Sequence, residues 1–335
     1  MTLERVRELP LQPDGFQQAA RDVRRQVRSV IVGQDEAVSG VLLCLLTGRH
    51  ALLEGVPGLG KTSLVRCFSR ALGLPYGRIQ FTPDMMPADI IGTNVLSRQA
   101  GEQPTVAFQP GPVFTNLLLA DEINRATPKT QSALLEAMEE RTVTVANTTR
   151  ELGDPFCVLA TQNPIEAHGT YPLPEAQLDR FLLKLQFRLP ERAELSEIVM
   201  HTGNSIQPAV EQVANAGLLA AMTALVRAVP MAAHVVDYAS RLILALHPDN
   251  PAAPEPVRRF VRRGPSPRGA QALCLAGRAA ALLDDRFSLA YRDIRSVSGP
   301  ALRHRLVLSL EGQREGISPD DIVESTLERI PEDER

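Results

Sequence analysis

The chain has 335 residues, 44% hydrophobic and 22% charged, so it is long enough for two domains, or for one large one, with a full core. A net charge of −3 does not indicate a protein that binds nucleic acid or a membrane surface through its overall charge. The four cysteines are widely separated and do not indicate a disulfide framework or a zinc site. Residues 1–10 lack the apolar core of a signal peptide, and the longest early apolar run, residues 41–46, is too short for a bilayer. We therefore expect a cytoplasmic protein that is not inserted into a membrane.

Two segments with helical periodicity open the chain. Apolar residues recur at helical spacing over residues 16–30 and again over residues 36–46. The break between these segments holds Val32 and Gly33, a small pair just ahead of the motif described next. Such a pair could cradle the base of a nucleotide, and a plain turn between two helices explains the spacing equally well.

A glycine-rich stretch, residues 55–62, follows an apolar strand-like run and precedes a segment with helical periodicity, residues 62–72. It matches the pattern of a phosphate-binding loop, in which glycines turn backbone N–H groups inward and the helix adds its positive end. We expect Lys61 to contact the β- and γ-phosphates of ATP and the Thr62 hydroxyl to bind Mg²⁺. The predicted nucleotide ligands from this stretch are Gly55, Pro57, Gly58, Leu59, Gly60, Lys61, Thr62 and Ser63. A glycine-rich turn beside a surface lysine would also explain the loop, so a second motif is needed.

The second motif is a pair of acids at the end of a continuous apolar run, residues 117–120. Such a run is typical of a strand buried on both faces of a parallel sheet. Asp121 and Glu122 follow it directly, at the strand end where α/β sheets bind their ligands. We expect Asp121 to hold Mg²⁺, directly or through water, and Glu122 to polarise the water that attacks the γ-phosphate. Solvated charges at a strand end are the weaker interpretation once the loop is considered.

Three further strand-like features lie between residues 94 and 160. Alternating residues around turns predict β-hairpins over 94–108 and 142–152. Residues 155–160 form another apolar run, which leads to Asn163. This asparagine could hold the attacking water or sense the γ-phosphate, although a turn residue ahead of a proline is the simpler interpretation.

Arginines in the second half of the chain offer charge to a nucleotide. Arg180, in a predicted short helix over 175–181, could reach the nucleotide of a neighbouring subunit or could simply pair with Asp179. Ser266 and the proline after it predict a helix start, which places Arg268 in the first turn. A cation is unfavourable there unless an anion lies nearby, and a nucleotide phosphate would supply one.

The character of the sequence changes near residue 190. Strand-like runs stop there and helical segments continue to the end, so we expect an α/β domain over 1–190 and a helical domain over 191–335. One basic cluster in the second domain could contact nucleic-acid phosphates, but few aromatic residues accompany it and a solvated or intersubunit face is favoured. The cluster consists of Arg258, Arg259, Arg262 and Arg263.

These motifs resemble those of the MoxR family of AAA+ ATPases, and the resemblance covers nearly the whole chain. Residues 111–126 are similar to the family signature around the acid pair, and residues 160–164 and 171–181 to two further family segments. The resemblance implies a P-loop AAA+ core, an α/β fold with a parallel sheet flanked by helices, followed by a smaller all-α lid domain. It also implies that the hairpins are the helix-2 and pre-sensor-1 inserts and that Val32 and Gly33 contact adenine.

The same resemblance gives roles to three polar side chains. Asn163 is the expected sensor 1, Arg180 the arginine finger and Arg268 sensor 2. Arg125 and Arg141 remain alternatives to Arg180, because both lie near a plausible subunit edge.

The resemblance implies Mg²⁺-dependent ATP hydrolysis that drives chaperone-like remodelling or maturation of a client protein. The expected partners are a protein with a von Willebrand factor A domain and further copies of this chain, with a hexamer as the expected assembly. Two alternatives are a slow nucleotide-gated regulator and a motor stimulated by nucleic acid. The motor would need basic hairpins, and the two predicted hairpins offer only Arg98 and Arg150, so nucleic acid is not expected as a partner.

Overall fold

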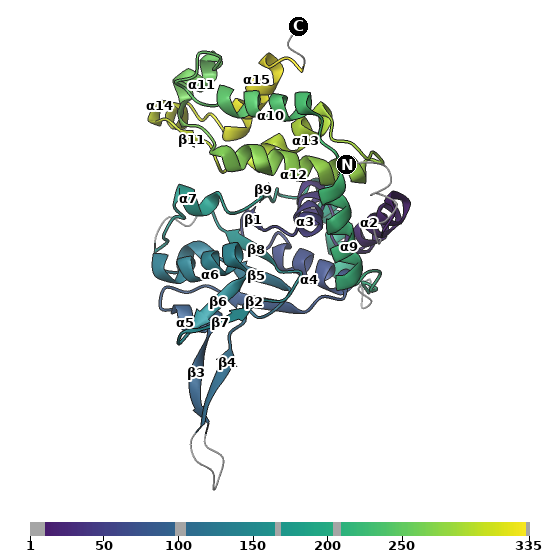
Figure 1. The fold of residues 1–335 in the computed structure, drawn as a ribbon, viewed down its shortest axis with the longest axis vertical. Helices are drawn as coiled ribbons and strands as arrows, with labels where there is room; N and C mark the ends of the chain where they lie inside the picture. The colour runs from purple at the N-terminus through teal and green to yellow at the C-terminus, as the bar shows by residue number, and fades with distance from the viewer. Residues whose placement is uncertain (1–10, 98–104, 165–168, 204–208, 333–335) are drawn as a thin grey trace.

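The computed structural model describes residues 11–97, 105–164, 169–203 and 209–332. An α/β core lies in the middle, a group of helices lies at one end, and a hairpin projects from the other end (Figure 1). Residues 1–10, Arg98 and the turn of the first predicted hairpin lie outside the described residues.

A five-stranded parallel sheet forms the centre of the core, in the order β2-β5-β8-β1-β9. The apolar runs predicted as strands account for β1, β5 and β8, and the pattern of residues 78–81 also predicts a strand, which overlaps β2. Strand β9 has a lysine between its leucines and was not predicted. Apart from a half-buried last residue, each of the three inner strands is buried, as continuous apolar runs require. The strands are β1 (Ala51–Glu54), β2 (Tyr76–Gln80), β5 (Leu117–Asp121), β8 (Cys157–Gln162) and β9 (Leu183–Gln186).

Helices cover both faces of this sheet. Successive strand residues point to opposite faces and therefore pack against different helices. Leu53 packs into the larger apolar cluster with α2 (Pro13–Arg28), α3 (Asp35–Thr47) and α4 (Lys61–Leu72). Leu52 packs into a second cluster on the other face, with the short α5 (Pro87–Ile91) and with α6 (Pro128–Glu140). The predicted parallel sheet flanked by helices is therefore confirmed.

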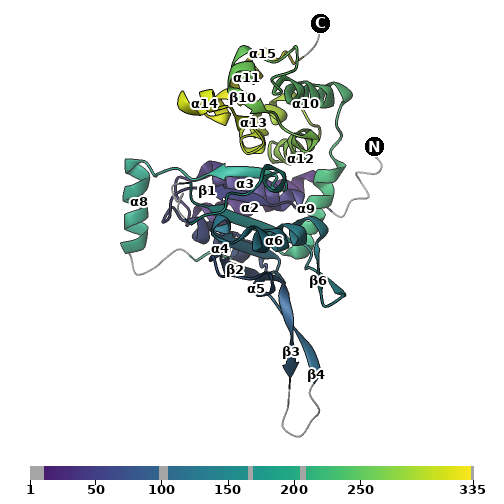
Figure 2. The ribbon, with the colours of Figure 1, turned by 90° about the vertical axis from the view of Figure 1, so that its left-hand side faces the viewer.

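Two antiparallel hairpins extend from the core where the sequence predicted them. The first, β3 (Gly92–Ser97) with β4 (Thr105–Pro110), projects away from the body in both ribbon views (Figures 1 and 2). The second is β6 (Thr142–Val145) with β7 (Thr148–Glu151). The guanidinium carbon of Arg150 lies 3.8 Å from the ring centroid of Phe108, so a cation–π contact joins the two hairpins.

After β9 the chain is almost entirely helical. A short antiparallel pair, β10 with β11, is an addition that the sequence did not predict. Helix α9 packs along α3 of the core, and Figure 2 shows α8 standing apart from the body. The elements are α8 (Arg192–Gly203), α9 (Ala216–Ala228), α10 (Ala233–Ala245), α11 (Glu255–Phe260), β10 (Val261–Arg263), α12 (Pro267–Leu283), α13 (Tyr291–Leu302), β11 (Val307–Leu308), α14 (Leu310–Arg314) and α15 (Pro319–Arg329). Among the described residues, no helix combines the length and apolar character needed to cross a bilayer.

Candidate active site

The phosphate-binding loop joins β1 to α4, as its sequence predicts. Gly58 and Gly60 both have φ +86°, and a Cβ on either would meet nothing within 4 Å. Glycine is therefore required for the left-handed backbone and not for space. The Lys61 ammonium donates hydrogen bonds to the carbonyl oxygens of Gly55 and Val56, the second at 3.3 Å. Burial lowers the pKa of Lys61, and the nearby carboxylates oppose that shift.

The acid pair ends β5 at the same edge of the sheet. Glu122 has φ 58°, which turns the chain sharply out of the strand into a short 3₁₀ helix, η1 (Ile123–Arg125). The buried Thr161 of the neighbouring strand β8 connects both acids. Its hydroxyl donates to Asp121 Oδ1 at 2.7 Å and accepts from the Glu122 backbone N–H at 2.8 Å. The sequence motif contained Thr161, but only the register of β5 against β8 reveals this role.

Strand β2 supports the acids from the other side. Arg78 Nη2 lies 2.7 Å from Asp121 Oδ2, and Gln80 Nε2 donates to Glu122 Oε2 at 3.0 Å. Arg125 Nε also lies 3.0 Å from Glu122 Oε2. The guanidinium of Arg125 therefore belongs to the acid site of its own chain.

The loop, the acids and the predicted sensor meet around one cavity of about 320 Å³, here called the loop cavity. Its lining residues are Pro57, Gly58, Gly60, Lys61, Thr62, Ser63, Asp121, Glu122, Thr161 and Asn163. A hydroxyl and a carboxylate are ligands that Mg²⁺ accepts beside phosphate oxygens, so Thr62 and Asp121 fit this ion. The backbone nest and Lys61 fit the phosphates of a nucleotide.

The other predicted nucleotide ligands lie elsewhere. Gly55 and Leu59 belong to the loop but do not line the loop cavity. Gly33 has φ +72°, and a Cβ there would lie 2.4 Å from the carboxyl carbon of Glu194 in α8. Val32 and Gly33 thus adjoin the start of α8, and neither lines the loop cavity.

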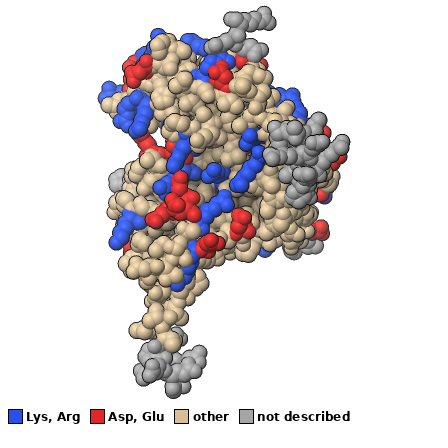
Figure 3. All heavy atoms as spheres, in the orientation of Figure 1, with Lys and Arg blue, Asp and Glu red and all other residues tan. Residues whose placement is uncertain are grey.

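Arg180 and Arg268 meet in a second cavity of about 260 Å³, here called the arginine cavity. Glu139 at the end of α6 lies 3.3 Å from Arg180 Nε and 3.0 Å from Arg268 Nη2. The anion beside Arg268 within this chain is therefore Glu139, where the sequence suggested a phosphate. Basic side chains gather on this face between the helices and the core (Figure 3). The lining residues are Arg49, Glu139, Asp179, Arg180, Phe181, Leu182, Arg268, Gln271, Ala272, Leu275 and Arg305.

The two cavities lie at opposite edges of the sheet. Arg49 and Leu182 precede the parallel strands β1 and β9, so the arginine cavity borders the amino-terminal edge. The loop follows β1 and the acids end β5, so the loop cavity borders the carboxyl-terminal edge. A four-residue strand such as β1 is about 13 Å long. The structure therefore does not bring Arg180 or Arg268 to the loop cavity of the same chain.

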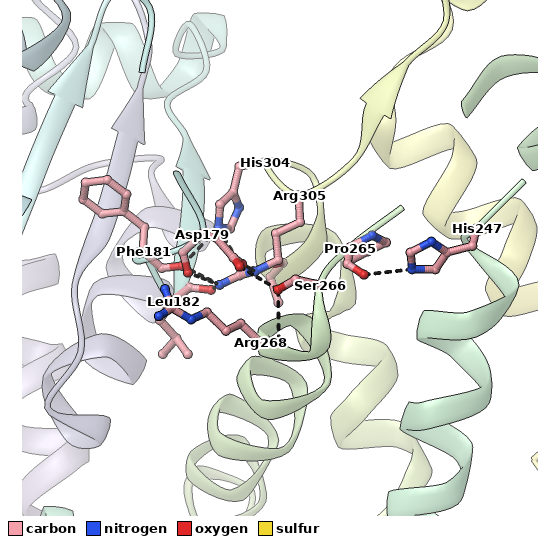
Figure 4. A network of polar contacts seen from close by, with 10 residues as sticks. Asp179, Phe181, Leu182, His247, Pro265, Ser266, Arg268, His304 and Arg305 are labelled. Atoms are coloured by element: carbon pink, nitrogen blue, oxygen red, sulfur yellow. Dashed lines mark hydrogen bonds and ion pairs between the residues drawn. The ribbon is translucent and has the colours of Figure 1, made fainter. Parts of the chain in front are cut away.

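A polar network beside this second cavity joins Arg305 and the start of α12 to Asp179 (Figure 4). Asp179 does not pair with Arg180, as one interpretation of the sequence suggested, but with the buried Arg305, at 2.7 Å. Its other oxygen accepts from the Ser266 hydroxyl at 2.6 Å. Ser266 in turn accepts from the Arg268 backbone N–H at 3.1 Å, which confirms the predicted helix start of α12.

The basic cluster of α11 and β10 takes part in ion pairs within the chain. Arg259 pairs with Glu311 and Glu315 of α14, each at 2.6 Å. Arg262 and Arg263 pair with Glu175, which begins the short helix α7 (Glu175–Leu178). These contacts agree with a solvated face, because surface pairs of this kind are common and weak.

Comparisons with known proteins agree with this geometry. The family model for the "ATPase family associated with various cellular activities (AAA)" matches residues 50–183, and the AAA lid domain model matches residues 257–326. The chain is 41% identical over 305 residues to the Chaperone MoxR1 of Mycobacterium tuberculosis, which covers 91% of this chain and 80% of that protein. It is 33% identical over 334 residues to the Protein MoxR of Paracoccus denitrificans, which covers 93% and 95% of the two chains.

A solved structure from Cytophaga hutchinsonii shares the fold. It superposes with a TM-score of 0.88 at 36% identity and covers 95% of this chain and 96% of that one. Both parts of the molecule are therefore found together in a related protein. With the phosphate loop and the acid pair at one cavity, and with these relatives matched over most of their length, the chain belongs to the MoxR family of AAA+ ATPases.

Proposed function

We propose that this chain hydrolyses ATP with Mg²⁺ as a homo-oligomer, expected to be a hexamer, and thereby remodels or matures a client protein. The observation that carries the proposal is the division of the site between two cavities. The loop cavity offers a phosphate nest and two acids, and the arginine cavity offers guanidinium groups at the opposite edge of the sheet. Two copies packed edge to edge would unite these halves.

The chemistry of the loop cavity follows from its side chains. Lys61 orients the β- and γ-phosphates as a point charge, and Glu122 accepts the proton of the attacking water. Asn163 holds that water in line with the γ-phosphate. Thr62 and Asp121 would hold Mg²⁺, which neutralises phosphate charge when it is bound.

The arginine cavity would act on the nucleotide of a second copy. Arg180 and Arg268 then stabilise the charge that develops on the transferred phosphoryl group. Arg125 is the less suited alternative because it lies at the acid site, whereas Arg141 has partners within its own chain just as Arg180 has Glu139. Arg125 contacts the Glu122 of its own chain, and Arg141 donates to the Gly48 carbonyl at 2.8 Å and pairs with Asp154 at 3.4 Å.

The client side of the proposal is supported by the hairpin of β3 and β4. Leu96 and Val106 are cross-strand partners there and are 76% and 66% exposed. An exposed apolar pair on a projecting hairpin suits contact with a protein. The family resemblance suggests that the partner has a von Willebrand factor A domain. Three arginines of the basic cluster of α11 and β10 form ion pairs within the chain, so no specific observation favours a nucleic-acid motor.

Three variants test the proposal. Lys61→Ala should abolish ATP binding, whereas Glu122→Gln should bind ATP and stop turnover. Arg180→Ala should keep ATP binding and lower the rate about a thousand-fold, as expected for an arginine finger. Mixing Arg180→Ala with Glu122→Gln subunits should restore activity, because each supplies the half that the other lacks.

The mixture also gives the outcome that contradicts the proposal. If the two inactive variants stay inactive together while both still assemble, the arginine does not act on a second copy. Normal hydrolysis by Glu122→Gln would contradict the assignment of the base. Proteins that co-purify with Glu122→Gln in the presence of ATP identify the client, and a captured protein with a von Willebrand factor A domain would support the finer prediction.

A further inference from the structure

Arg49 lies at the arginine cavity without a role in the site described above. It connects α3 to β1, and its backbone is held at both ends. Its N–H donates to the Cys44 carbonyl at 2.9 Å, and its carbonyl accepts from the Cys157 thiol at 3.1 Å. The side chain lines the cavity and is in part open to solvent. A fixed main chain therefore presents a guanidinium group at the rim.

The cavity has more positive charge than its acids can balance. Asp179 is neutralised by Arg305, and both side chains are largely buried. Glu139 is shared by Arg180 and Arg268. In the part of the chain that the structure describes, no hydrogen bond or ion pair is assigned to the Arg49 guanidinium. One carboxylate thus faces three guanidinium groups that are not neutralised elsewhere.

The electrostatics at Arg49 point in the same direction. Partial burial lowers the pKa of Arg49, and the charges of Arg141 and Arg227 add to this shift, while Glu139 opposes it. The local field is therefore positive enough to disfavour another cation. An anion placed between Arg49, Arg180 and Arg268 would relieve this repulsion.

We propose that Arg49 is a third phosphate-contacting arginine, which binds the nucleoside triphosphate held in the loop cavity of a second copy together with Arg180 and Arg268. The inference rests on the proposed action of the arginine cavity on a neighbouring nucleotide. Arg305 cannot take this part. Its guanidinium already donates to Asp179 and to the carbonyl oxygens of Phe181 at 2.7 Å and Leu182 at 3.1 Å.

The first test measures assembly and not turnover. In the Glu122→Gln background, ATP should drive association that analytical ultracentrifugation detects. Adding Arg49→Ala should raise the protein concentration needed for ATP-driven association about tenfold, as expected for losing one charge-assisted hydrogen bond. Arg49→Lys should recover part of this loss because it restores a charge. Arg292→Ala, which removes an exposed arginine of α13, is the matched control and should behave like its parent.

In the second test, Arg49→Ala is made in the wild-type chain, without Glu122→Gln, and is then mixed with other subunits. Below the concentration at which it assembles, Arg49→Ala should bind a fluorescent ATP analogue with unchanged affinity, and at assembling concentrations it should hydrolyse ATP at least about tenfold more slowly. Mixing it with Glu122→Gln subunits should restore hydrolysis, because these subunits carry an intact Arg49. Thermal unfolding of Arg49→Ala and Arg49→Lys shows whether either variant is misfolded, in which case the folded one supplies the result.

The outcomes separate this inference from the proposed function. If Arg180→Ala and Arg268→Ala lose activity and are rescued in mixtures while Arg49→Ala matches Arg292→Ala, the role of Arg49 is overturned alone. If none of the three arginine-cavity variants regains activity in mixtures, the arginines do not act on a second copy. Both the proposed function and the role of Arg49 are then contradicted. The three-arginine site is established if all three variants lose ATPase activity and regain it in mixtures, and if Arg49→Ala also weakens ATP-driven association.

Discussion

Thr161 is the residue on which both acids of the loop cavity depend. Its hydroxyl donates to Asp121 and accepts from the Glu122 backbone, so Thr161→Val removes both contacts with little change in volume. Because loss of such a supporting contact typically costs about 10- to 100-fold in activity, we expect turnover to fall by that range. ATP affinity should change little, since Lys61 and the loop are untouched. Steady-state ATPase assays and nucleotide titration measure the two effects.

Thr149→Val on the exposed strand β7 is the matched control for this substitution. It removes a hydroxyl that forms a hydrogen bond with Thr144 at 3.1 Å, on a hairpin outside the loop cavity, so turnover should stay at the wild-type value. Equal rates for the two variants would show that Thr161 does not support the acids.

His50 makes the stability of the core depend on pH. Its ring is buried, accepts from the Val158 N–H at 2.9 Å and donates to the Met138 carbonyl at 3.1 Å. Burial lowers the pKa of His50 to about 4. The unfolded chain therefore takes up this proton near pH 6.5, before the folded chain does, and stability falls as the pH drops from about 6.5 to about 4. Between pH 7.5 and 5, the free energy of unfolding should decrease by about 2 kcal/mol from this group.

Urea unfolding of the wild type and of His50→Gln at both pH values measures this contribution. The variant should lose about 2 kcal/mol of the pH dependence, whatever its stability at pH 7.5. His304 is also buried and has a lowered pKa, so part of the dependence remains. An equal pH dependence in His50→Gln and in the wild type would contradict the assignment.

Sequence motifs predicted individual residues where the chemistry is local. The phosphate loop, the acid pair and Asn163 carry their own pattern, and the structure places them at one cavity. Thr161 and Arg49 escaped notice for a physical reason. A threonine in a strand and an arginine before one are common, and only pairing between distant segments gives them neighbours. Arg180 and Arg268 were predicted as polar candidates, but their shared partner Glu139 depends on how the helices pack on the core.

At the scale of elements, the connection between α13 and β11 fastens the helical part to the sheet. Arg305 pairs with Asp179, and its guanidinium also donates to carbonyl oxygens just before β9. His304 contacts the Phe181 carbonyl at 3.1 Å, and Arg303 donates to the Lys184 carbonyl at 3.2 Å. This segment therefore binds backbone groups that the edge of the sheet would otherwise leave unpaired.

Arg305→Met should lower the free energy of unfolding by about 3–5 kcal/mol, because it leaves Asp179 buried without its cation. We also expect Ser266→Ala to cost about 1 kcal/mol through loss of the helix cap. Urea denaturation measures both values. Arg292→Met is the control, since that arginine is exposed and should change stability little. A loss below about 1 kcal/mol for Arg305→Met would mean that water replaces the pair at low cost.

The elements themselves were predictable to different degrees. Helices with a capping residue or strong periodicity, such as α12 and α4, begin within one residue of the predicted position. Strands buried on both faces were recognised from their continuous apolar runs. Strand β9 alternates leucine with polar residues, a pattern typical of a strand, but it is only four residues long and was not recognised. The β10–β11 pair is only two or three residues long, too short to give a local signal stronger than that of a loop.

At the scale of the whole molecule, a site divided between two copies makes specific activity depend on concentration. A lone subunit holds the loop cavity but cannot bring its own arginine cavity to the bound nucleotide, since the two lie at opposite edges of the sheet. We therefore expect ATPase activity per subunit to rise with protein concentration and to level off once assembly is complete. Sedimentation measured in the same buffer should show association over the same concentration range.

The dependence on salt concentration is an independent test of whether the site is divided between two copies. The contacts proposed between copies are between arginines and phosphates, so raising the ionic strength should shift both the activity curve and the association curve to higher protein concentration. Lys61→Ala should remove the ATP-dependent part of association, because it takes away the bound triphosphate that the arginines contact. Activity per subunit that stays constant through the range where assemblies dissociate would show that one copy suffices. The arginine cavity would then serve only to hold the helical part on the core.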